Sequence, residues 1–315
     1  MIRLDFTQLH EIASVEALIE PVRLAFLKGA NVPPRLHYDI GKEAGDATLL
    51  LMPSWQTGDR VGIKIATVVG SNPARGLPSV SAQYLLLDAK TGQFLASLDG
   101  RALTLLRTAA VSALAADLLA PAEPEVLLLV GTGALIPYLA SGHSAVRRYT
   151  SIKVWGRDQN KAAATVAELA RDGLPAEVAA DLQDAVRSAD VISCATMSDE
   201  PLVLGRWLKP KTHLDLVGGY RPSMREADDD CVRNAFVATD TLTALEECGD
   251  LRTPIENGVL DASAVVPLDR LVRESALQHP TGSTVFKSVG VALSDLAAAR
   301  WIVNQPALAQ LTPKA

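Results

Sequence analysis

Lys64, a residue that could take part in binding or catalysis, lies in an otherwise apolar segment, residues 61–66 (VGIKIA). Side chains of an extended strand alternate between its two faces, so Gly62, Lys64 and Ala66 share one face. A lysine between two very small side chains faces a surface with room for a ligand, where its ammonium group can bind an anion or donate a proton. The alternative is a charged residue that protects an edge strand from pairing with another chain.

Two arginines extend this pattern. Arg107 interrupts the apolar face that Leu103 and Leu114 form in a long helical segment. A buried unpaired charge is costly, so Arg107 requires an anionic partner, either an internal carboxylate or a substrate or cofactor group. Arg35 is a third cation with the same ambiguity. Because arginine binds carboxylates with two parallel hydrogen bonds, Arg35, Lys64 and Arg107 together predict a site for a small carboxylate.

A glycine-rich loop, residues 131–136 (GTGALI), directly follows the apolar run 126–130 (VLLLV). Gly131 and Gly133 allow a sharp turn and a close approach to a pyrophosphate, whose charge is met by N–H groups at a helix N-terminus. The third position of this fingerprint is Ile136 rather than glycine or alanine, which implies looser packing of helix on strand. A strand before the loop and a helix after it favour a dinucleotide site over a structural turn.

The type of dinucleotide is read at the end of the next strand, residues 151–156. An acid there binds the ribose 2′-hydroxyl of NAD, whereas an arginine accepts the 2′-phosphate of NADP. Here Arg157 follows the strand, and Asp158 is interpreted as a helix cap. The sequence therefore favours NADPH, with NADH as the alternative, and a solvated loop position as the alternative role of Arg157.

The elements that must position these residues fall into two groups. In the first part of the chain, apolar residues at helical spacing predict helices at 15–28 and 102–120. Strand-like segments predict strands at 48–52, 60–69, 81–88 and 93–99. Short strands on short loops, with a hairpin turn at 89–92, predict a largely antiparallel sheet.

The second part alternates strands with helices. Strands are expected at 126–130, 151–156, 176–180, 191–196, 213–217, 236–239 and 284–289, and helices at 159–171 and 182–189. This alternation predicts a parallel α/β sheet of the Rossmann type. A last helix, 290–303, is expected to pack back on the first part. The fold class is thus α/β, with a Rossmann domain at 121–289 and an α+β domain at 1–120 and 290–315.

Composition narrows the class of protein. With 315 residues, 48% of them hydrophobic and 21% charged, the chain has the size and composition of a two-domain globular enzyme. A net charge of −6 offers no basic surface to nucleic acid or an anionic membrane. No signal peptide and no apolar run of about 18 residues is expected. Three scattered cysteines and five histidines without metal-ligand spacing predict reduced thiols, no metal site and a cytoplasmic location.

Several segments, in order along the chain, resemble the ornithine cyclodeaminase/mu-crystallin family. They are GLPSV (76–80), DAKTG (88–92), DG (99–100), LT (103–104), RTAA (107–110), GTGA (131–134), ADV (189–191), GDL (249–251), FKSVG (286–290) and DLAAA (295–299). The similarity runs over nearly the whole chain, and RTAA and FKSVG are its most specific elements.

The resemblance implies roles for these residues. Arg35, Lys64 and Arg107 would bind the substrate carboxylate and polarise the reacting nitrogen or carbonyl. The dinucleotide would be lined by Ser79, Arg107, Thr108, Gly131, Gly133, Ala134, Leu135, Arg157, Thr196 and Ser288. The resemblance also implies a homodimer formed through the antiparallel domain.

One departure from the family pattern bears on activity. Cyclodeaminases of the family carry an acid directly after a Gly-Gly pair, whereas this chain has Tyr220 after Gly218-Gly219. Without that proton shuttle, ornithine cyclodeamination is disfavoured. The remaining expectation is NAD(P)H-dependent reduction of a cyclic ketimine, 1-pyrroline-2-carboxylate to L-proline or 1-piperideine-2-carboxylate to L-pipecolate. The alternatives are an alanine-type amino-acid dehydrogenase and a non-catalytic NADP-dependent protein that binds a small ligand.

Overall fold

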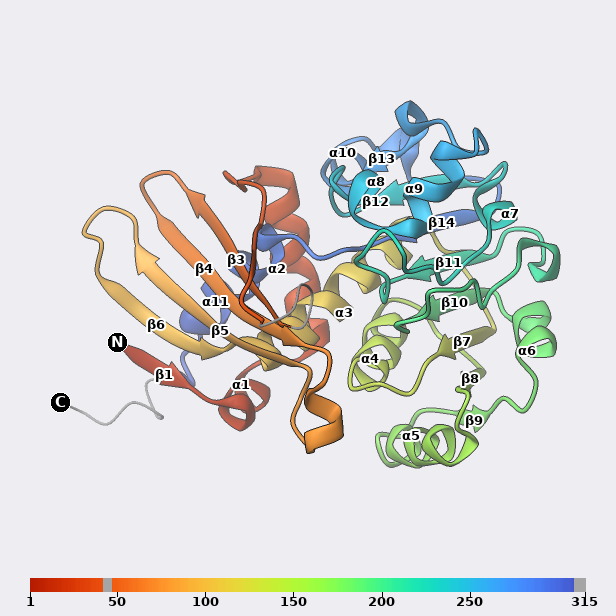
Figure 1. Ribbon diagram of the computed structural model, residues 1–315, viewed down its shortest axis with the longest axis horizontal. Coiled ribbons are helices and arrows are strands. Elements are labelled where there is room, and N and C mark those ends of the chain that lie inside the picture. Colours follow the sequence, from red (N-terminus) through yellow and green to blue (C-terminus); the bar gives the residue numbers. More distant parts are fainter. Residues whose placement is uncertain (42–46, 309–315) are drawn as a thin grey trace. The chain divides into compact units, whose positions relative to one another are not determined.

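The computed structural model describes residues 1–41 and 47–308, and the chain divides into two compact units (Figure 1). The first unit comprises Met1–Thr108 and Val291–Ala315, and the second comprises Ala109–Gly290. The first division falls inside the helix α3 (Gly100–Leu119), whereas the sequence places it at the end of that helix.

Within the described residues, the first unit contains a six-stranded sheet of order β1-β6-β5-β4-β3-β2. Its strands are β1 (Ile2–Leu4), β2 (Leu36–Asp39), β3 (Ala47–Gln56), β4 (Arg60–Val69), β5 (Val80–Asp88) and β6 (Phe94–Asp99). Neighbouring strands are antiparallel except for the pair β1 and β6. The predicted, largely antiparallel sheet is confirmed, and β4 has the predicted bounds.

One face of this sheet is covered by helices. The unit also holds α1 (Phe6–Ile12), α2 (Val15–Lys28), the short 3-10 turn η1 (Asn72–Arg75) and α11 (Ala292–Val303). Helix α11 packs on β3, β4 and β5 and also on α2, so the prediction that the last helix returns to the first part of the chain is confirmed. Ser14 caps the N-terminus of α2, because its side chain accepts a hydrogen bond from the Ala17 N–H. The predicted apolar face of α2 is buried.

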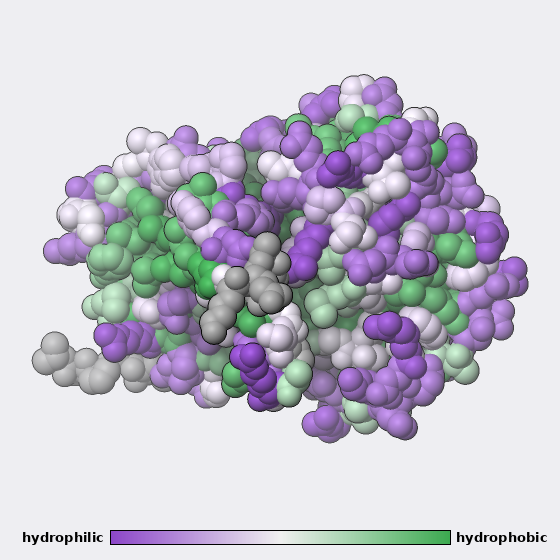
Figure 2. Space-filling model, viewed as in Figure 1, coloured by the Kyte–Doolittle hydropathy of each residue, from purple (hydrophilic) through white to green (hydrophobic). Residues whose placement is uncertain are grey.

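The other face of the sheet is apolar and open to solvent. Register places the side chains of Leu51, Ile65 and Gln83 on one face, and Ile65 is 37% exposed. On the edge strand β2, Leu36 pairs with Leu51, and Leu36 is 46% exposed. Figure 2 shows hydrophobic side chains gathered over β4 and β5. This face, called here the outer face, is a large exposed apolar patch for a protein that acts alone.

The second unit contains an eight-stranded parallel sheet of order β13-β12-β14-β11-β10-β7-β8-β9, within the part of the chain that is described. Its strands are β7 (Val126–Val130), β8 (Ser151–Trp155), β9 (Ala176–Val178), β10 (Val191–Cys194), β11 (His213–Leu216), β12 (Phe236–Thr239), β13 (Val266–Pro267) and β14 (Thr284–Lys287). Strands β10, β11 and β14 are fully buried, as expected for the centre of a sheet covered on both faces. The predicted parallel Rossmann-type sheet is confirmed.

The order of these strands creates a switch point beside β7. From β7 the chain runs outward through β8 and β9, and then returns to β10 on the other side of β7. In open α/β sheets ligands bind at such a switch point, outside the carboxyl ends of the strands. The connecting helices are α4 (Ile136–Val146), α5 (Gln159–Arg171), α6 (Leu182–Ser188), α7 (Asp229–Val232), α8 (Ala244–Glu247), α9 (Gly249–Glu256) and α10 (Leu268–Arg273).

Helix α3 is the one described helix that has the length and composition of a membrane span. From the sequence, no apolar run of about 18 residues was expected, and the helix predicted at 102–120 was not identified as one. However, 89% of its apolar window is buried inside the protein. Its apolar character is explained by that burial, as in the core helices of globular proteins.

Candidate active site

Two of the predicted cations meet on a single carboxylate in the first unit. Lys64 Nζ lies 2.8 Å from Asp295 Oδ2, and Arg107 Nε donates to Asp295 Oδ1 at 2.9 Å. Lys64 is 4% exposed, Arg107 5% and Asp295 0%. Burial raises the pKa of Asp295, but the charges of Arg107 and Lys64 more than offset this and hold it below its usual value. The carboxylate is therefore ionised at neutral pH.

Lys64 is an unusually acidic lysine. Burial lowers its pKa from 10.5 to about 8, although Asp295 raises it, and the positive charges of Arg107 and Arg35 lower it further. Arg35, directly before β2, therefore acts electrostatically on Lys64. We call Arg35, Lys64 and Arg107, together with Asp295, the cation cluster. Guanidinium and ammonium groups of this kind suit a small anion.

The structure bears on two alternatives that the sequence left open. Strand β4 pairs with β3 and β5 and is not at an edge, so Lys64 is not an edge-strand gatekeeper. Arg107 has an internal carboxylate, Asp295, as a partner for its Nε, but its Nη1 is buried without a hydrogen-bond partner among the described residues. A buried guanidinium nitrogen without an acceptor is costly, and a bound carboxylate would supply one.

One expectation about Lys64 was wrong. The space beside Gly62 is not open to a ligand, because a Cβ atom there would lie 1.7 Å from the Tyr84 hydroxyl oxygen. Tyr84 is fully buried, and burial raises its pKa well above 10, with the charge of Asp295 acting in the same direction. Its hydroxyl is therefore a neutral group beside the cation cluster.

Sequence reasoning missed Asp295 as a functional residue and noted it only within the DLAAA segment. It lies in the first turn of α11, where nearly every other residue is small or apolar. A lone carboxylate in an apolar helix is the same kind of signal as Arg107 in its own apolar helix. That signal marks Asp295 as a buried charge that needs a partner, but it does not say which cation the partner is.

The glycine-rich loop of the second unit has the geometry of a dinucleotide loop. Gly131 has a φ of 127°, and a Cβ atom there would lie 2.7 Å from the Ala195 carbonyl oxygen, so only glycine fits. Gly133 is exposed, with no atom within 4 Å of a Cβ placed there. Among the described residues, the N–H groups of Gly133, Ala134 and Leu135 donate to no other group. They stand at the start of α4 and fit a pyrophosphate.

Ile136, at the third fingerprint position, is accommodated in the protein core. Ile136 is fully buried, and its Cδ1 lies 3.4 Å from the position of a Cβ at Gly131. The bulkier side chain therefore fills the junction between β7 and α4. At the end of β8, Asp158 caps α5 by accepting from the N–H groups of Asn160 and Lys161, as predicted. Arg157 is exposed and stays a candidate for a phosphate contact.

The other predicted dinucleotide residues are divided between the units. Thr196 follows β10, and its N–H and hydroxyl both donate to Glu226 Oε1. Ser288 follows β14, is 1% exposed and donates to Asp240. Ser79 and Thr108 belong to the first unit, as does Arg107. Ser79 is half-buried and its carbonyl oxygen accepts from the Val69 N–H, whereas Thr108 is 6% exposed.

Tyr220 replaces the acid expected after the Gly-Gly pair and is half-buried. The Arg221 guanidinium carbon lies 5.2 Å from the centre of its ring, a cation–π contact. The next buried acid along this loop is Glu226. Its carboxylate accepts hydrogen bonds from two backbone N–H groups. The position after the Gly-Gly pair is thus held by a side chain that is not a carboxylate.

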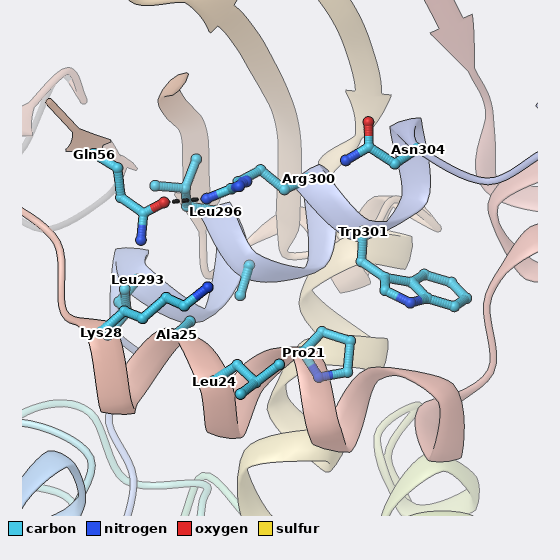
Figure 3. Close-up of a pocket in the computed structure, with 11 residues that line it drawn as sticks. Pro21, Leu24, Ala25, Lys28, Gln56, Leu293, Leu296, Arg300, Trp301 and Asn304 are labelled. Carbon is cyan, nitrogen blue, oxygen red and sulfur yellow. Dashed lines mark hydrogen bonds between the residues drawn. The ribbon is translucent and has the colours of Figure 1, made fainter. Parts of the chain in front are cut away.

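A separate pocket of about 220 Å³ lies between α2 and α11 in the first unit (Figure 3). Pro21 and Leu24 line one side, and Arg300 enters from α11. Arg300 donates to Gln56 and forms an ion pair of 2.9 Å with Asp59. The residues of the cation cluster do not line this pocket, so it is distinct from the candidate site.

Comparisons with known proteins agree on a family. The ornithine cyclodeaminase/mu-crystallin family matches residues 4–308. A Delta(1)-pyrroline-2-carboxylate reductase of Paracoccus denitrificans is 36% identical over 287 residues, which cover 89% of this chain and 90% of that protein. The solved Delta(1)-pyrroline-2-carboxylate reductase of Thermococcus litoralis, in complex with NADH and L-proline, superposes with a TM-score of 0.92 at 28% identity over 100% of both chains. An archaeal alanine dehydrogenase dimer with bound NAD has a TM-score of 0.90 at 25% identity, covering 100% and 98%.

Proposed function

The chain belongs to the ornithine cyclodeaminase/mu-crystallin family of NAD(P)-dependent oxidoreductases and deaminases, and from this we propose that it reduces a cyclic imino acid. The proposed reactions are 1-pyrroline-2-carboxylate to L-proline and 1-piperideine-2-carboxylate to L-pipecolate. The observation that carries the proposal is the buried Arg107 Nη1, an unused donor beside an acidic lysine.

Each member of the cation cluster has a part in this reaction. Arg107 would bind the substrate carboxylate through its buried Nη1, and the nearby positive charge of Arg35 would assist. Asp295 would fix the orientation of both Lys64 and Arg107, because its Oδ1 accepts a hydrogen bond from each and its Oδ2 lies 2.8 Å from Lys64 Nζ. A carboxylate held in this way orients the adjacent C=N bond, and orientation of this kind lowers barriers by several kcal/mol.

Lys64 would supply the proton that the imine nitrogen gains. When bound, the reduced nicotinamide supplies the hydride, which goes to C2, so that the C=N bond becomes CH–NH and the cofactor is oxidised. A lysine with a pKa of about 8 is protonated at neutral pH and still acidic enough to donate. The second possibility is that Lys64 only orients an iminium that is already protonated.

The preferred dinucleotide is proposed to be NADPH, with NADH as the alternative. Arg157 is exposed directly after β8, where a 2′-phosphate binds in NADP enzymes, and Asp158 is engaged as a helix cap. The solved relatives named above hold NADH and NAD. They support a nicotinamide cofactor for this chain, and the preference for NADPH rests on Arg157 alone.

The test is a parallel measurement of NADPH and NADH oxidation with both cyclic imino acids, with pyruvate plus ammonium, and with ornithine. We expect turnover of the cyclic imino acids without ammonium. Lys64→Ala at saturating cofactor is expected to lower that turnover by more than about a hundredfold, with the exposed Lys90→Ala as the matched control. Turnover of Lys64→Ala within a few-fold of the unmodified protein would show that the role given to Lys64 is wrong.

The alternative is an amino-acid dehydrogenase that interconverts alanine with pyruvate and ammonia, which the similarity to the archaeal alanine dehydrogenase favours. Oxidation of NADPH with pyruvate that depends strictly on ammonium would identify it. Retained cofactor binding without turnover of any substrate would instead identify a binding protein.

A homodimer formed through the outer face accompanies the proposal. The face carries exposed apolar side chains on two strands, Leu36 on β2 and Ile65 on β4. The archaeal alanine dehydrogenase of the same fold is a dimer. The cytoplasmic location stays a prediction.

A further inference from the structure

A second buried carboxylate lies in the second unit, whereas the proposed substrate-binding groups belong to the first. Glu226 is fully buried. Its Oε1 accepts from the Thr196 N–H at 2.6 Å and from the Thr196 hydroxyl at 2.8 Å, and its Oε2 accepts from the Gly218 N–H at 2.7 Å. One side chain thus holds two loops at once.

These two loops lie at the cofactor edge of the sheet. Thr196 follows β10 and Gly218 follows β11, and the two strands are parallel neighbours. Strand β10 flanks the switch point, where dinucleotides bind beyond the carboxyl ends of the strands. The loop after β10 also contacts the glycine-rich loop, because Ala195 is the residue that excludes a side chain at Gly131.

The loops after β10 and β11 are closely packed at Gly218. A Cβ atom at Gly218 would lie 1.9 Å from the Thr196 carbonyl oxygen and 2.5 Å from Glu226 Oε1. Glu226 itself is held by its own N–H, which donates to Asp250 Oδ1 at 2.7 Å. Lys287 Nζ lies 2.9 Å from Asp250 Oδ2 and 3.9 Å from Glu226 Oε2. The carboxylate is therefore fixed from behind and aimed at both loops.

We propose that Glu226 is a positioning residue that, in its ionised form, sets the loops after β10 and β11 in the geometry that binds the nicotinamide dinucleotide. The proposal rests on the cofactor class of the proposed function and not on its substrate. Each carboxylate oxygen faces a backbone N–H, from Thr196 on one side and Gly218 on the other. A proton on either oxygen would oppose a donor and release one of the loops.

The ionisation of Glu226 is poised near neutral pH. Burial raises its pKa to about 7, with Lys287 lowering it, Asp250 raising it and the hydrogen bonds from Thr196 lowering it. Besides these groups, the buried Cys194 thiol of β10 interacts with Glu226, and burial raises the pKa of that thiol, so it is neutral. Cofactor affinity is thus expected to fall as pH drops from 8 to 6.

The experiment uses the full chain and Glu226→Gln, which keeps the shape of the side chain but sets an NH₂ donor against one of the two N–H groups. Dissociation constants for NADH and NADPH are measured at pH 6 and pH 8 by energy transfer from protein to the reduced nicotinamide, without substrate. We expect Glu226→Gln to bind about tenfold to hundredfold more weakly at pH 8 and to lose the pH dependence of the unmodified protein. The exposed Glu246→Gln is the matched control.

Binding by Glu226→Gln within twofold of the unmodified protein, with the same pH dependence, overturns the proposal. If that variant does not fold, amide hydrogen exchange of the unmodified protein decides: protection of the Thr196 and Gly218 N–H groups, corrected for intrinsic exchange, should fall about tenfold from pH 8 to pH 6, and unchanged protection refutes the inference. Normal dinucleotide binding without imino-acid turnover would overturn the proposed function and leave this inference standing.

Discussion

Replacing Asp295 by asparagine tests the cation cluster most directly. The substitution keeps the shape of the side chain but leaves Lys64 and Arg107 buried without their shared counter-charge. Breaking a buried ion pair by removing one partner costs about 3–5 kcal/mol, a large part of the stability of a typical domain. Because both cations are at most 5% exposed, solvent screening reduces this figure little.

The pKa of Lys64 gives the effect on activity. Its fall from 10.5 to about 8 means that the protein destabilises the ammonium form of Lys64 by about 3 kcal/mol relative to water. Asp295 raises this pKa, whereas Arg107 and Arg35 lower it, so Asp295→Asn moves it below 8. Because donation requires the ammonium form, kcat/KM declines as pH rises through the pKa of Lys64, and in Asp295→Asn that decline begins at lower pH.

The assays are kcat/KM for the cyclic imino acid between pH 5.5 and 9.5 and the free energy of unfolding in urea. The double variant Lys64→Met/Asp295→Asn is expected to recover part of the lost stability, because it removes one unpaired cation. The exposed Glu11→Gln of α1 is the control. The reasoning is refuted if Asp295→Asn keeps the same pH midpoint as the unmodified protein and loses less than about 1 kcal/mol of stability.

Three further substitutions test the cofactor loop, the dinucleotide preference and the outer face. Gly131→Ala is expected to lower the free energy of unfolding by about 1–3 kcal/mol and to weaken NADH binding, because its φ of 127° and the Ala195 carbonyl oxygen exclude a Cβ; equal melting temperatures would contradict this. Arg157→Ala should raise the Kd for NADPH about tenfold and leave that for NADH unchanged, and parallel losses for both would argue against a phosphate contact. Ile65→Glu should convert a dimer into a monomer in light scattering, whereas the exposed Lys90→Glu should not.

For the segments with a clear periodicity, the sequence alone indicated helix or strand and which way the side chains alternate, whereas short elements such as β1, β2 and α1 were not predicted. Alternation along residues 60–69 placed Lys64 on the face that is now seen buried beneath α11, and the apolar neighbours of Arg107 required an anion for it. The glycine spacing after β7 and the strand–helix alternation predicted the parallel sheet and its dinucleotide loop. These features depend on residues close together in the chain, and backbone periodicity records them directly.

The tertiary structure decided which distant groups meet. Asp295 lies 188 residues from Arg107 and 231 from Lys64, so no local pattern could pair them. Whether β4 is an edge strand or a central one depends on how the strands are ordered in the sheet. The same holds for Glu226, whose carboxylate gains its altered pKa only where folding removes water and brings Lys287 and Asp250 beside it. Burial and charge act through space, and only the packed chain defines the distances on which they depend.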